Sequence, residues 1–410
     1  MFISSSFIAL ISLALTVAAN PIVVRDSPIS LPLVRRVNST GTISLVERDQ
    51  ARVRHLKARA NALAAGKFEE DAVTSVPATN QLVDYAVSVS VGSPATTYSL
   101  LVDTGSSNTW LGADKAYKTT STSVKTSNKV SVEYGSGSFS GTEYTDTVAL
   151  GSLTITAQSI GVASKSSGFD GIDGILGIGP VDLTTGTLSP ATSQSIPTVT
   201  DNLFSKGTIP SDLVSVYFQP TTSESSTNGE LTFGGTDSSK FTGSISYTPI
   251  TSTSPASFYW GINESIKYGS TNILSSTAGI VDTGTTLVLI ASDAFSKYKS
   301  ATGAVADNAT GLLRLTTAQY ANLQNLVFTT NGVSYTLTPN AQIWPRSLNS
   351  AIGGSSSSVY LIVASIGTPS GEGLDFINGL TFLERFYSVF DTANKRVGFA
   401  TTSFTTATSN

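Results

Sequence analysis

From about residue 83 to the C-terminus, apolar and polar residues alternate in short runs separated by Gly, Ser, Asn and Asp. A period of two is typical of half-buried β-strands, and Asn-Gly between two such runs is typical of a hairpin turn. The clearest runs cover residues 85–91, 153–162, 214–218, 326–337 (around Asn331-Gly332) and 387–400. The pattern predicts an all-β body rather than a parallel α/β sheet, because no regular strand-helix-strand order is present. We expect short helices at 198–204, 292–300 and 316–324.

The N-terminal region has two different patterns. Residues 7–19 form a run of apolar or small residues, which matches the apolar core of a secretory signal and is short for a membrane span. We therefore predict a signal peptide at 1–19 and a secreted, extracellular protein that does not bind a membrane. Residues 45–65 then repeat apolar positions at helical spacing and predict one amphipathic helix.

Charge separates this N-terminal region from the rest. Nine of the 24 Lys and Arg residues and six of the 28 Asp and Glu residues precede residue 72, so the remainder has 15 basic and 22 acidic residues and a net charge of -7. A cationic arm before an acidic body indicates a propeptide at 20–71, and a disordered tail is the alternative. The acidic body gives no reason to expect a nucleic-acid partner.

The composition excludes several kinds of chemistry. The 410 residues include no cysteine, and the single histidine, His55, lies in the expected propeptide. Disulfides, thiolate nucleophiles and zinc knuckles are excluded, as are a Ser-His-Asp triad and a histidine metal site in the mature chain. Catalysis would then use carboxylates, hydroxyls, lysine, arginine or the backbone. We expect no metal and no cofactor.

One internal repeat stands out. Residues 101–107, Leu-Val-Asp-Thr-Gly-Ser-Ser, recur as Ile-Val-Asp-Thr-Gly-Thr-Thr at 280–286. In each copy two aliphatic residues bring a buried strand to its end, Asp follows, and Gly allows a tight turn. A purely structural turn is the alternative interpretation, but chance does not explain two such extended copies.

Two such loops facing each other would place Asp103 and Asp282 side by side. Carboxylates about 3 Å apart share a proton, so that one serves as a base and the other as an acid near the same pH. Such a pair can take a proton from water, direct the water at an amide carbonyl and protonate the leaving nitrogen. The repeat therefore predicts hydrolysis of peptide bonds without histidine or metal.

These motifs resemble those of the pepsin-like aspartic proteases over essentially the whole mature chain. The resemblance implies a bilobal all-β fold with lobes at 72–250 and 251–410, a cleft between them, and Asp103 and Asp282 as the catalytic pair. It implies that Ser106 and Thr285 hydrogen-bond the dyad, that Thr104 and Thr283 tie the two loops together, and that Gly105 and Gly284 lie near the water and substrate.

Residues 132–138, Val-Glu-Tyr-Gly-Ser-Gly-Ser, resemble the mobile hairpin called the flap in this family. Tyr134 matches the tyrosine that closes over substrate, next to Gly135 and Ser136, and Trp110 matches the tryptophan that hydrogen-bonds it. An ordinary surface hairpin is the alternative for Tyr134. Because fungal relatives that cleave after lysine carry Asp where this chain has Ser136, we expect weak cleavage after lysine and a preference for large apolar residues.

Residues 173–177, Asp-Gly-Ile-Leu-Gly, match the element packed beneath the first loop. Its counterpart at 376–379, Phe-Ile-Asn-Gly, departs from the family, which usually has Leu at the position of Asn378. We interpret this departure as local repacking. The family's usual disulfides are also missing.

The resemblance further implies a zymogen in which a basic propeptide residue pairs with the two aspartates until acid releases it. Lys57, Arg59 and Lys67 are the candidates, and a solvated helix face is the alternative for each. Asn38, Asn263 and Asn308 begin N-glycosylation sequons, the last two in the mature part.

We expect a monomer whose partners are protein or peptide substrates and pepstatin-type inhibitors. Two other functions are the alternatives, a non-catalytic binder of the same fold and a glycosidase that uses paired carboxylates.

Overall fold

The structure, a computed structural model, describes residues 28–37, 44–67 and 83–410. The predicted signal peptide, the predicted start of the mature chain near residue 72 and the Asn38 sequon lie outside these residues. No described helix is long and apolar enough to cross a membrane.

The N-terminal part of the described chain contains the following elements: β1 (Ile29–Val37), α1 (Leu45–Ala64), β2 (Val83–Val91), β3 (Thr96–Asp103), β4 (Thr109–Leu111), β5 (Val124–Glu133), β6 (Ser138–Leu150), β7 (Leu153–Ser167), β8 (Gly174–Gly177), β9 (Leu188–Ser189), α2 (Val199–Ser205), β10 (Leu213–Tyr217), β11 (Ser225–Phe233) and β12 (Thr242–Pro249).

The C-terminal part contains β13 (Gly261–Tyr268), β14 (Thr271–Val281), β15 (Val288–Ile290), α3 (Ser292–Thr302), β16 (Val305–Ala306), β17 (Leu313–Leu315), α4 (Thr317–Tyr320), β18 (Leu326–Thr330), β19 (Val333–Leu337), β20 (Val359–Leu361), β21 (Val363–Ser365), β22 (Phe376–Asn378), α5 (Leu380–Leu383), β23 (Phe386–Asp391) and β24 (Arg396–Thr401). The strands confirm the predicted all-β class. The helix predicted at 316–324 is shorter than expected, because α4 ends at Tyr320.

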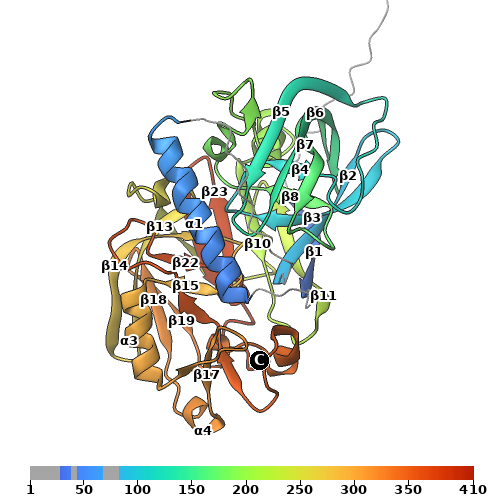
Figure 1. Ribbon diagram of the computed structural model, residues 1–410. Helices are drawn as coiled ribbons and strands as arrows, with labels where there is room; N and C mark the ends of the chain where they lie inside the picture. Colours follow the sequence, from blue (N-terminus) through green and yellow to red (C-terminus); the bar gives the residue numbers. More distant parts are fainter. Residues whose placement is uncertain (1–27, 38–43, 68–82) are drawn as a thin grey trace, which may run out of the picture.

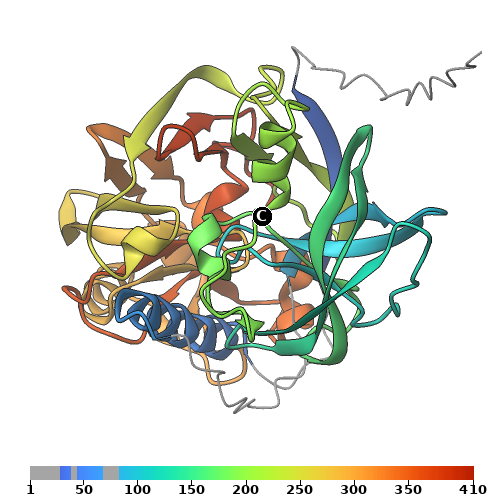
Figure 2. The same cartoon turned by 90° about the horizontal axis from the view of Figure 1, so that it is seen from above.

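Three sheets organise these strands. A 14-stranded sheet runs in the order β12-β24-β23-β10-β11-β1-β2-β3-β8-β4-β7-β6-β5-β9, a 7-stranded sheet in the order β19-β18-β13-β14-β22-β15-β21, and a 3-stranded sheet in the order β16-β17-β20. Seen from above, the cyan and green strands occupy one side and the yellow to red strands the other (Figure 2). The fold is bilobal.

The central part of each lobe repeats the same pairing. In the first, β8 pairs parallel with β3 and antiparallel with β4. In the second, β22 pairs parallel with β14 and antiparallel with β15. Leu176 is thereby opposite Val102 and Thr109, just as Asn378 is opposite Val281 and Val288. The two Asp-Thr-Gly loops therefore leave equivalent places in the two lobes.

Strand β1 belongs to the predicted propeptide yet lies inside the large sheet, between β11 and β2. It inserts the wholly buried Arg35, whose Nε lies 2.8 Å from an oxygen of Glu384. Burying a guanidinium is costly unless it is paired, so this ion pair fixes β1 in the sheet. The alternation of residues did not predict this strand.

Helix α1 confirms the helix predicted at 45–65. Ser44 caps it, because its hydroxyl accepts from the Glu47 N–H at 3.3 Å while the Glu47 carboxylate accepts from the Ser44 N–H at 3.1 Å. The helix lies across both lobes (Figure 1), and its backbone is held by the Tyr259 hydroxyl, which donates to the Leu56 carbonyl at 2.8 Å.

Candidate active site

The two predicted loops meet beneath α1. Asp103 ends β3, Asp282 directly follows β14, and both side chains are fully buried. Ser106 donates its hydroxyl to the Asp103 carboxylate at 2.6 Å, and Thr285 does the same for Asp282 at 2.6 Å. Each carboxylate is thus held by a hydroxyl three residues later in the chain, as the resemblance implied.

Glycine is required at the centre of each loop. The N–H of Gly105 donates to Asp103 at 2.9 Å and that of Gly284 donates to Asp282 at 3.0 Å. A Cβ on either glycine would overlap the aspartate of the opposite loop and the guanidinium of Arg52. The loops can approach this closely only without side chains at 105 and 284.

The two threonines exchange hydrogen bonds across the lobe boundary. The N–H of Thr104 donates to the Thr283 hydroxyl at 2.9 Å, and the N–H of Thr283 donates to the Thr104 hydroxyl at 2.9 Å. Each hydroxyl then donates to a carbonyl of the opposite strand, Thr104 to Val281 at 3.2 Å and Thr283 to Val102 at 2.9 Å. All of these groups are buried, so the exchange fixes the position of one carboxylate relative to the other.

A single arginine of α1 joins the two carboxylates. The Nη2 of Arg52 lies 2.6 Å from Asp103 Oδ1 and 2.9 Å from Asp282 Oδ1, and its Nε lies 2.7 Å from Asp282 Oδ2. Because one nitrogen contacts both side chains, the two carboxylates lie on either side of it. The pairing is bidentate toward Asp282 and single toward Asp103.

This arrangement separates the titrations of the two aspartates. Burial raises the pKa of Asp103, assisted by the charge of Asp282 and opposed by Arg52. Burial acts on Asp282 in the same direction, but Arg52 and the hydrogen bonds of Thr285 and Gly284 outweigh it and lower the pKa of Asp282. Burial disfavours the Arg52 cation, yet the two aspartates raise its pKa. The guanidinium stays charged and Asp282 is the more easily ionised carboxyl.

A hairpin covers the site from the first lobe. Strands β5 and β6 flank the turn at 134–137, closed by the Tyr134 N–H donating to the Gly137 carbonyl at 2.8 Å. Its tip lies against α1, where a Cβ on Gly135 would overlap the Ala51 carbonyl. Ser136 is half-buried in this turn. The predicted hairpin is therefore present and in contact with the helix that carries Arg52.

Trp110 and Tyr134 lie side by side, as the resemblance implied. The indole N–H and the tyrosine hydroxyl are both buried; burial and the charge of Asp103 raise the pKa of Tyr134, and hydrogen bonds to Trp110 and Ser106 oppose that shift. The two rings are stacked with centroids 6.4 Å apart, and both pack edge-on against Phe169. Aromatic packing and the contact between the indole and the phenol together place Tyr134 beside Trp110.

Comparison with known proteins agrees with this geometry. The family model for eukaryotic aspartyl proteases matches residues 84–402. The chain belongs to the eukaryotic aspartyl protease family. Polyporopepsin from Irpex lacteus is 82% identical over 340 residues, which is 83% of this chain and all of that protein. Pepsin A from Sus scrofa is 30% identical over 359 residues, 82% of this chain and 87% of that protein.

A solved structure gives the same result. The crystal structure of the aspartic proteinase from Irpex lacteus matches with a TM-score of 0.81 at 70% identity, and the match covers 94% of this chain and all of that chain. The predicted family and bilobal fold are confirmed. This aspartyl protease is a pepsin-like endopeptidase, a hydrolase that acts on peptide bonds.

The basic residue that meets the aspartates of this aspartyl protease differs from our candidates. Lys57 donates to the Thr368 hydroxyl at 2.7 Å and lies 3.5 Å from Glu372. Arg59 donates to the carbonyls of Leu183 and Thr185, and Lys67 is exposed beyond the end of α1. Those three assignments were wrong, because Lys57 and Arg59 lie beside the buried face of α1 and Lys67 lies beyond the end of the helix.

A usable signal was present in the sequence. Arg52 lies seven residues after Leu45 and four before Leu56, so the helical period places it among the buried apolar residues. A cation on an apolar helix face needs a buried anion, and the repeated aspartates were the obvious partners.

Sequence reasoning also missed a second contact of α1. The Asp49 carboxylate is wholly buried and accepts from the backbone N–H groups of Thr286 at 3.2 Å and Leu287 at 2.9 Å. Arg48 pairs with Asp49 at 2.7 Å and also donates to the Thr286 hydroxyl. The helix is thus anchored to the second loop by a carboxylate as well as by Arg52.

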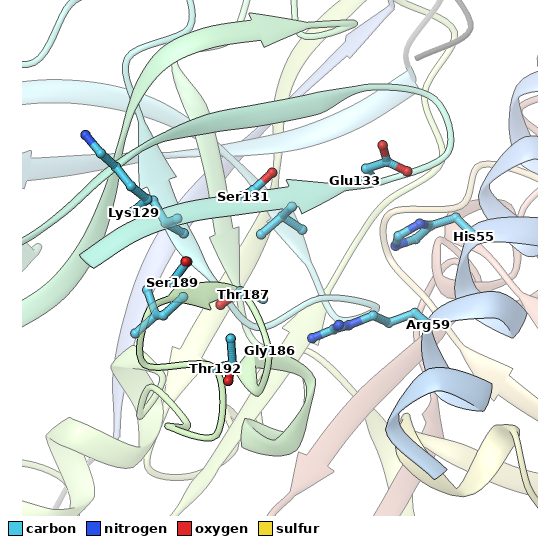
Figure 3. A pocket seen from close by; sticks show the side chains of 12 residues that line it. His55, Arg59, Lys129, Ser131, Glu133, Gly186, Thr187, Ser189 and Thr192 are labelled. Atoms are coloured by element: carbon cyan, nitrogen blue, oxygen red, sulfur yellow. The ribbon is translucent and has the colours of Figure 1, made fainter. Parts of the chain in front are cut away.

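Farther along α1, His55 and Arg59 project toward β5 and the loop at 186–192, where they line a pocket with Lys129 and Glu133 (Figure 3). Burial and the charges of Arg52 and Arg59 lower the pKa of His55 to about 3. His55 is therefore neutral over most of the acidic range and makes no contact with the dyad.

The departure at Asn378 has a structural partner. The buried Asn378 amide donates to both carboxyl oxygens of Glu264, each at 3.3 Å, and Glu264 is itself fully buried. Our interpretation as local repacking omitted this acid, because Glu264 lies in a strand far from the motif.

Asn263 and Asn308 are both exposed. Among the described residues, no group of three or more His, Cys, Asp or Glu could hold a metal ion.

Proposed function

We propose that the mature chain is an acid endopeptidase in which Asp103 and Asp282 activate a water molecule. The observation that carries the proposal is the shared Arg52 contact, since two buried carboxylates within reach of one nitrogen form a coupled pair. With one proton between them, the ionised carboxylate takes a proton from water and the protonated one donates to the substrate carbonyl. The tetrahedral intermediate then collapses as the leaving nitrogen is protonated.

Residues 20–71 act in this proposal as an activation segment that keeps the enzyme a zymogen. Arg52 occupies the place beside the dyad where the water and the scissile carbonyl would bind, and Asp49 occupies two backbone donors of the second loop. The contribution of Asp282 to docking is complete above its ordinary pKa of 3.8 and is lost as pH falls through the lowered value in the zymogen. Strong acid therefore favours release of α1.

The remaining parts of the proposal follow from the sequence and the family. Residues 1–19 direct the chain out of the cell, and the monomeric enzyme needs no cofactor. Its cleft takes protein or peptide substrates, prefers large apolar residues around the scissile bond, and accepts pepstatin-type inhibitors. Exposed Asn263 and Asn308 are the glycosylation candidates.

The test is hydrolysis of denatured globin at about pH 3 to 4, the range in which a shared-proton dyad is singly protonated. We expect proteolysis that pepstatin abolishes and that Asp103→Asn removes while the protein stays folded. Absence of proteolysis from a folded, fully processed sample would indicate a binding protein instead. Proteolysis that pepstatin does not inhibit would reject the dyad.

The zymogen is tested separately, by following activity and chain length together after a shift from neutral to acidic pH. We expect activity to rise only as α1 is released. Full activity at neutral pH from the intact chain would contradict the proposed inhibition.

A further inference from the structure

The second lobe contains an acid beneath its catalytic loop that the mechanism does not use. Glu264 lies on β13 and Asn378 on β22, on either side of β14, and both side chains are 0% exposed. The amide Nδ2 of Asn378 is 3.3 Å from each oxygen of Glu264. The backbone carbonyl of Asn378 accepts from the Asp282 N–H at 3.2 Å. Glu264 is therefore connected to Asp282 through one residue.

The first lobe has apolar residues at the equivalent positions. Glu264 lies opposite Thr277, three residues before Ile280 on β14. In the first lobe, Val89 lies opposite Tyr98, three residues before Leu101 on β3. By the same register, Leu176 is the counterpart of Asn378. Val89 and Leu176 are both buried in the core, so only the second lobe has a polar pair there.

The surroundings of Glu264 favour its neutral form. Asn378 is the only hydrogen-bond donor to its side chain among the described residues, and no described cation forms an ion pair with it. The phenol of Tyr335 on β19 is the titratable group that senses its charge. Burial raises the pKa of Glu264 to about 8, and the Asn378 bond opposes that shift. The Asn378 Oδ1 is buried without a partner among the described residues, so it can accept a carboxylic O–H.

We propose that Glu264 and Asn378 are a positioning pair for Asp282, joined as a neutral carboxylic acid and amide, and that ionisation of Glu264 loosens the Asp282 loop. Rotation of the Asn378 amide lets its Oδ1 accept the carboxylic proton while its Nδ2 donates to the other oxygen. When that proton leaves to solvent, the buried Glu264 carboxylate faces a single neutral donor. The strand that carries Asn378, β22, then moves away from Asp282. The effect of this pair on catalysis rests on the proposed function, whereas the contact between Glu264 and Asn378 does not depend on it.

The sign of the pH effect follows from linkage. The folded chain keeps the Glu264 proton to about pH 8, whereas the unfolded chain releases it near the ordinary value of 4.5. The contribution of Glu264 to stability is complete below that ordinary value and is lost as pH rises toward 8. One proton bound only by the folded chain changes the unfolding equilibrium about tenfold per pH unit. Ionisation of Glu264 therefore destabilises the folded chain as pH rises toward 8.

The experiment compares the full chain with Glu264→Gln, both carrying Asp103→Asn to prevent autolysis. Urea midpoints are measured at intervals from about pH 4 to pH 9, a range that brackets both pKa values of Glu264. Glu264→Gln leaves the amide donor of Asn378 in place and cannot ionise. Between the pKa values of Glu264 in the unfolded and folded chain, the unfolding constant of this variant should therefore change about tenfold less per pH unit than that of the parent. Glu224→Gln removes a carboxylate at an exposed position and should behave like the parent.

Hydrogen exchange tests the connection to Asp282. Protection of the segment 282–289 should fall in the parent above about pH 8 and persist in Glu264→Gln, because the group that ionises has been removed. Protection of the equivalent segment 103–111 should not differ between the two. An unchanged pH slope in Glu264→Gln, or equal loss of protection in both segments, would overturn the proposal.

If Glu264→Gln does not fold, the double variant Glu264→Val/Asn378→Leu replaces the pair with the residues of the first lobe. It should fold and show the same flat pH dependence. The two proposals are tested independently. The globin assay tests the proposed function whatever the unfolding data show, and the unfolding data test the Glu264–Asn378 pair even if the chain does not cleave globin.

Discussion

The two Asp-Thr-Gly loops are nearly identical in sequence but rest on different supports. The first lies on the apolar Leu176, whereas the second lies on Asn378 and the buried acid Glu264. Above these supports the hydroxyl, backbone and threonine contacts are matched to within a few tenths of an ångström. The contacts within the two loops are therefore equivalent, and the two lobes differ in the layer below, where only the second loop rests on a polar pair.

The largest expected effect tests whether the loops are equal in function. Asp103→Asn and Asp282→Asn should each lower kcat/KM of the processed enzyme by about 10³- to 10⁴-fold, because neither a lone acid nor a lone base completes the proton transfers. The measurement is cleavage of a chromogenic peptide at acidic pH, with thermal unfolding as the control for folding. If either variant retained more than a tenth of the activity, the two aspartates would not act as a pair.

The next largest effect is expected from removing Arg52, the group that makes the two loops electrostatically unequal. Arg52→Met in the full chain should weaken docking of α1 by about 150- to 5,000-fold, since deleting one partner of a buried ion pair costs about 3–5 kcal/mol. We expect early peptidase activity at mildly acidic pH before any processing, with chain length followed by electrophoresis. Arg54→Met on the exposed face of the same helix is the matched control. Equal latency of the two variants would contradict the role of Arg52.

The contrast between the loops also separates what the sequence predicts from what it does not. The repeat, the hairpin around Tyr134 and the runs at 153–162 and 326–337 depend on local patterns, and the structure has strands or turns at each. The partner of Glu264 lies 114 residues away along the chain, which periodicity does not reveal. Helical spacing marks Arg52 as buried, but its two partners lie 51 and 230 residues away. Strand β1 escaped prediction because its alternation is interrupted by Pro32 and two arginines, so its place in the sheet is set by its neighbours.

A smaller effect tests the symmetry of the threonine exchange. Thr104→Val and Thr283→Val should each lower the free energy of unfolding by about 1–3 kcal/mol, because each leaves a buried backbone N–H without its acceptor. The losses should be similar, and the double variant should lose less than their sum because the two side chains share one network. Urea unfolding of an inactive Asp103→Asn chain measures all three. Clearly unequal single losses would show that one lobe supports the exchange more than the other.

The smallest effect concerns a feature found on one side of the dyad only, the flap of the first lobe. Ser136 lies half-buried in the turn beside Tyr134, so Ser136→Asp would place a carboxylate at the edge of the cleft. We expect the ratio of kcat/KM for lysine over leucine before the scissile bond to rise about tenfold, through an ion pair worth about 1 kcal/mol or slightly more in this partly shielded place. Ser166→Asp, exposed on β7, adds the same charge away from the turn and should leave the ratio unchanged. A rise in both variants would mean that net charge, rather than the flap, governs acceptance of lysine, and the two sides of the cleft would then differ less than their structures indicate.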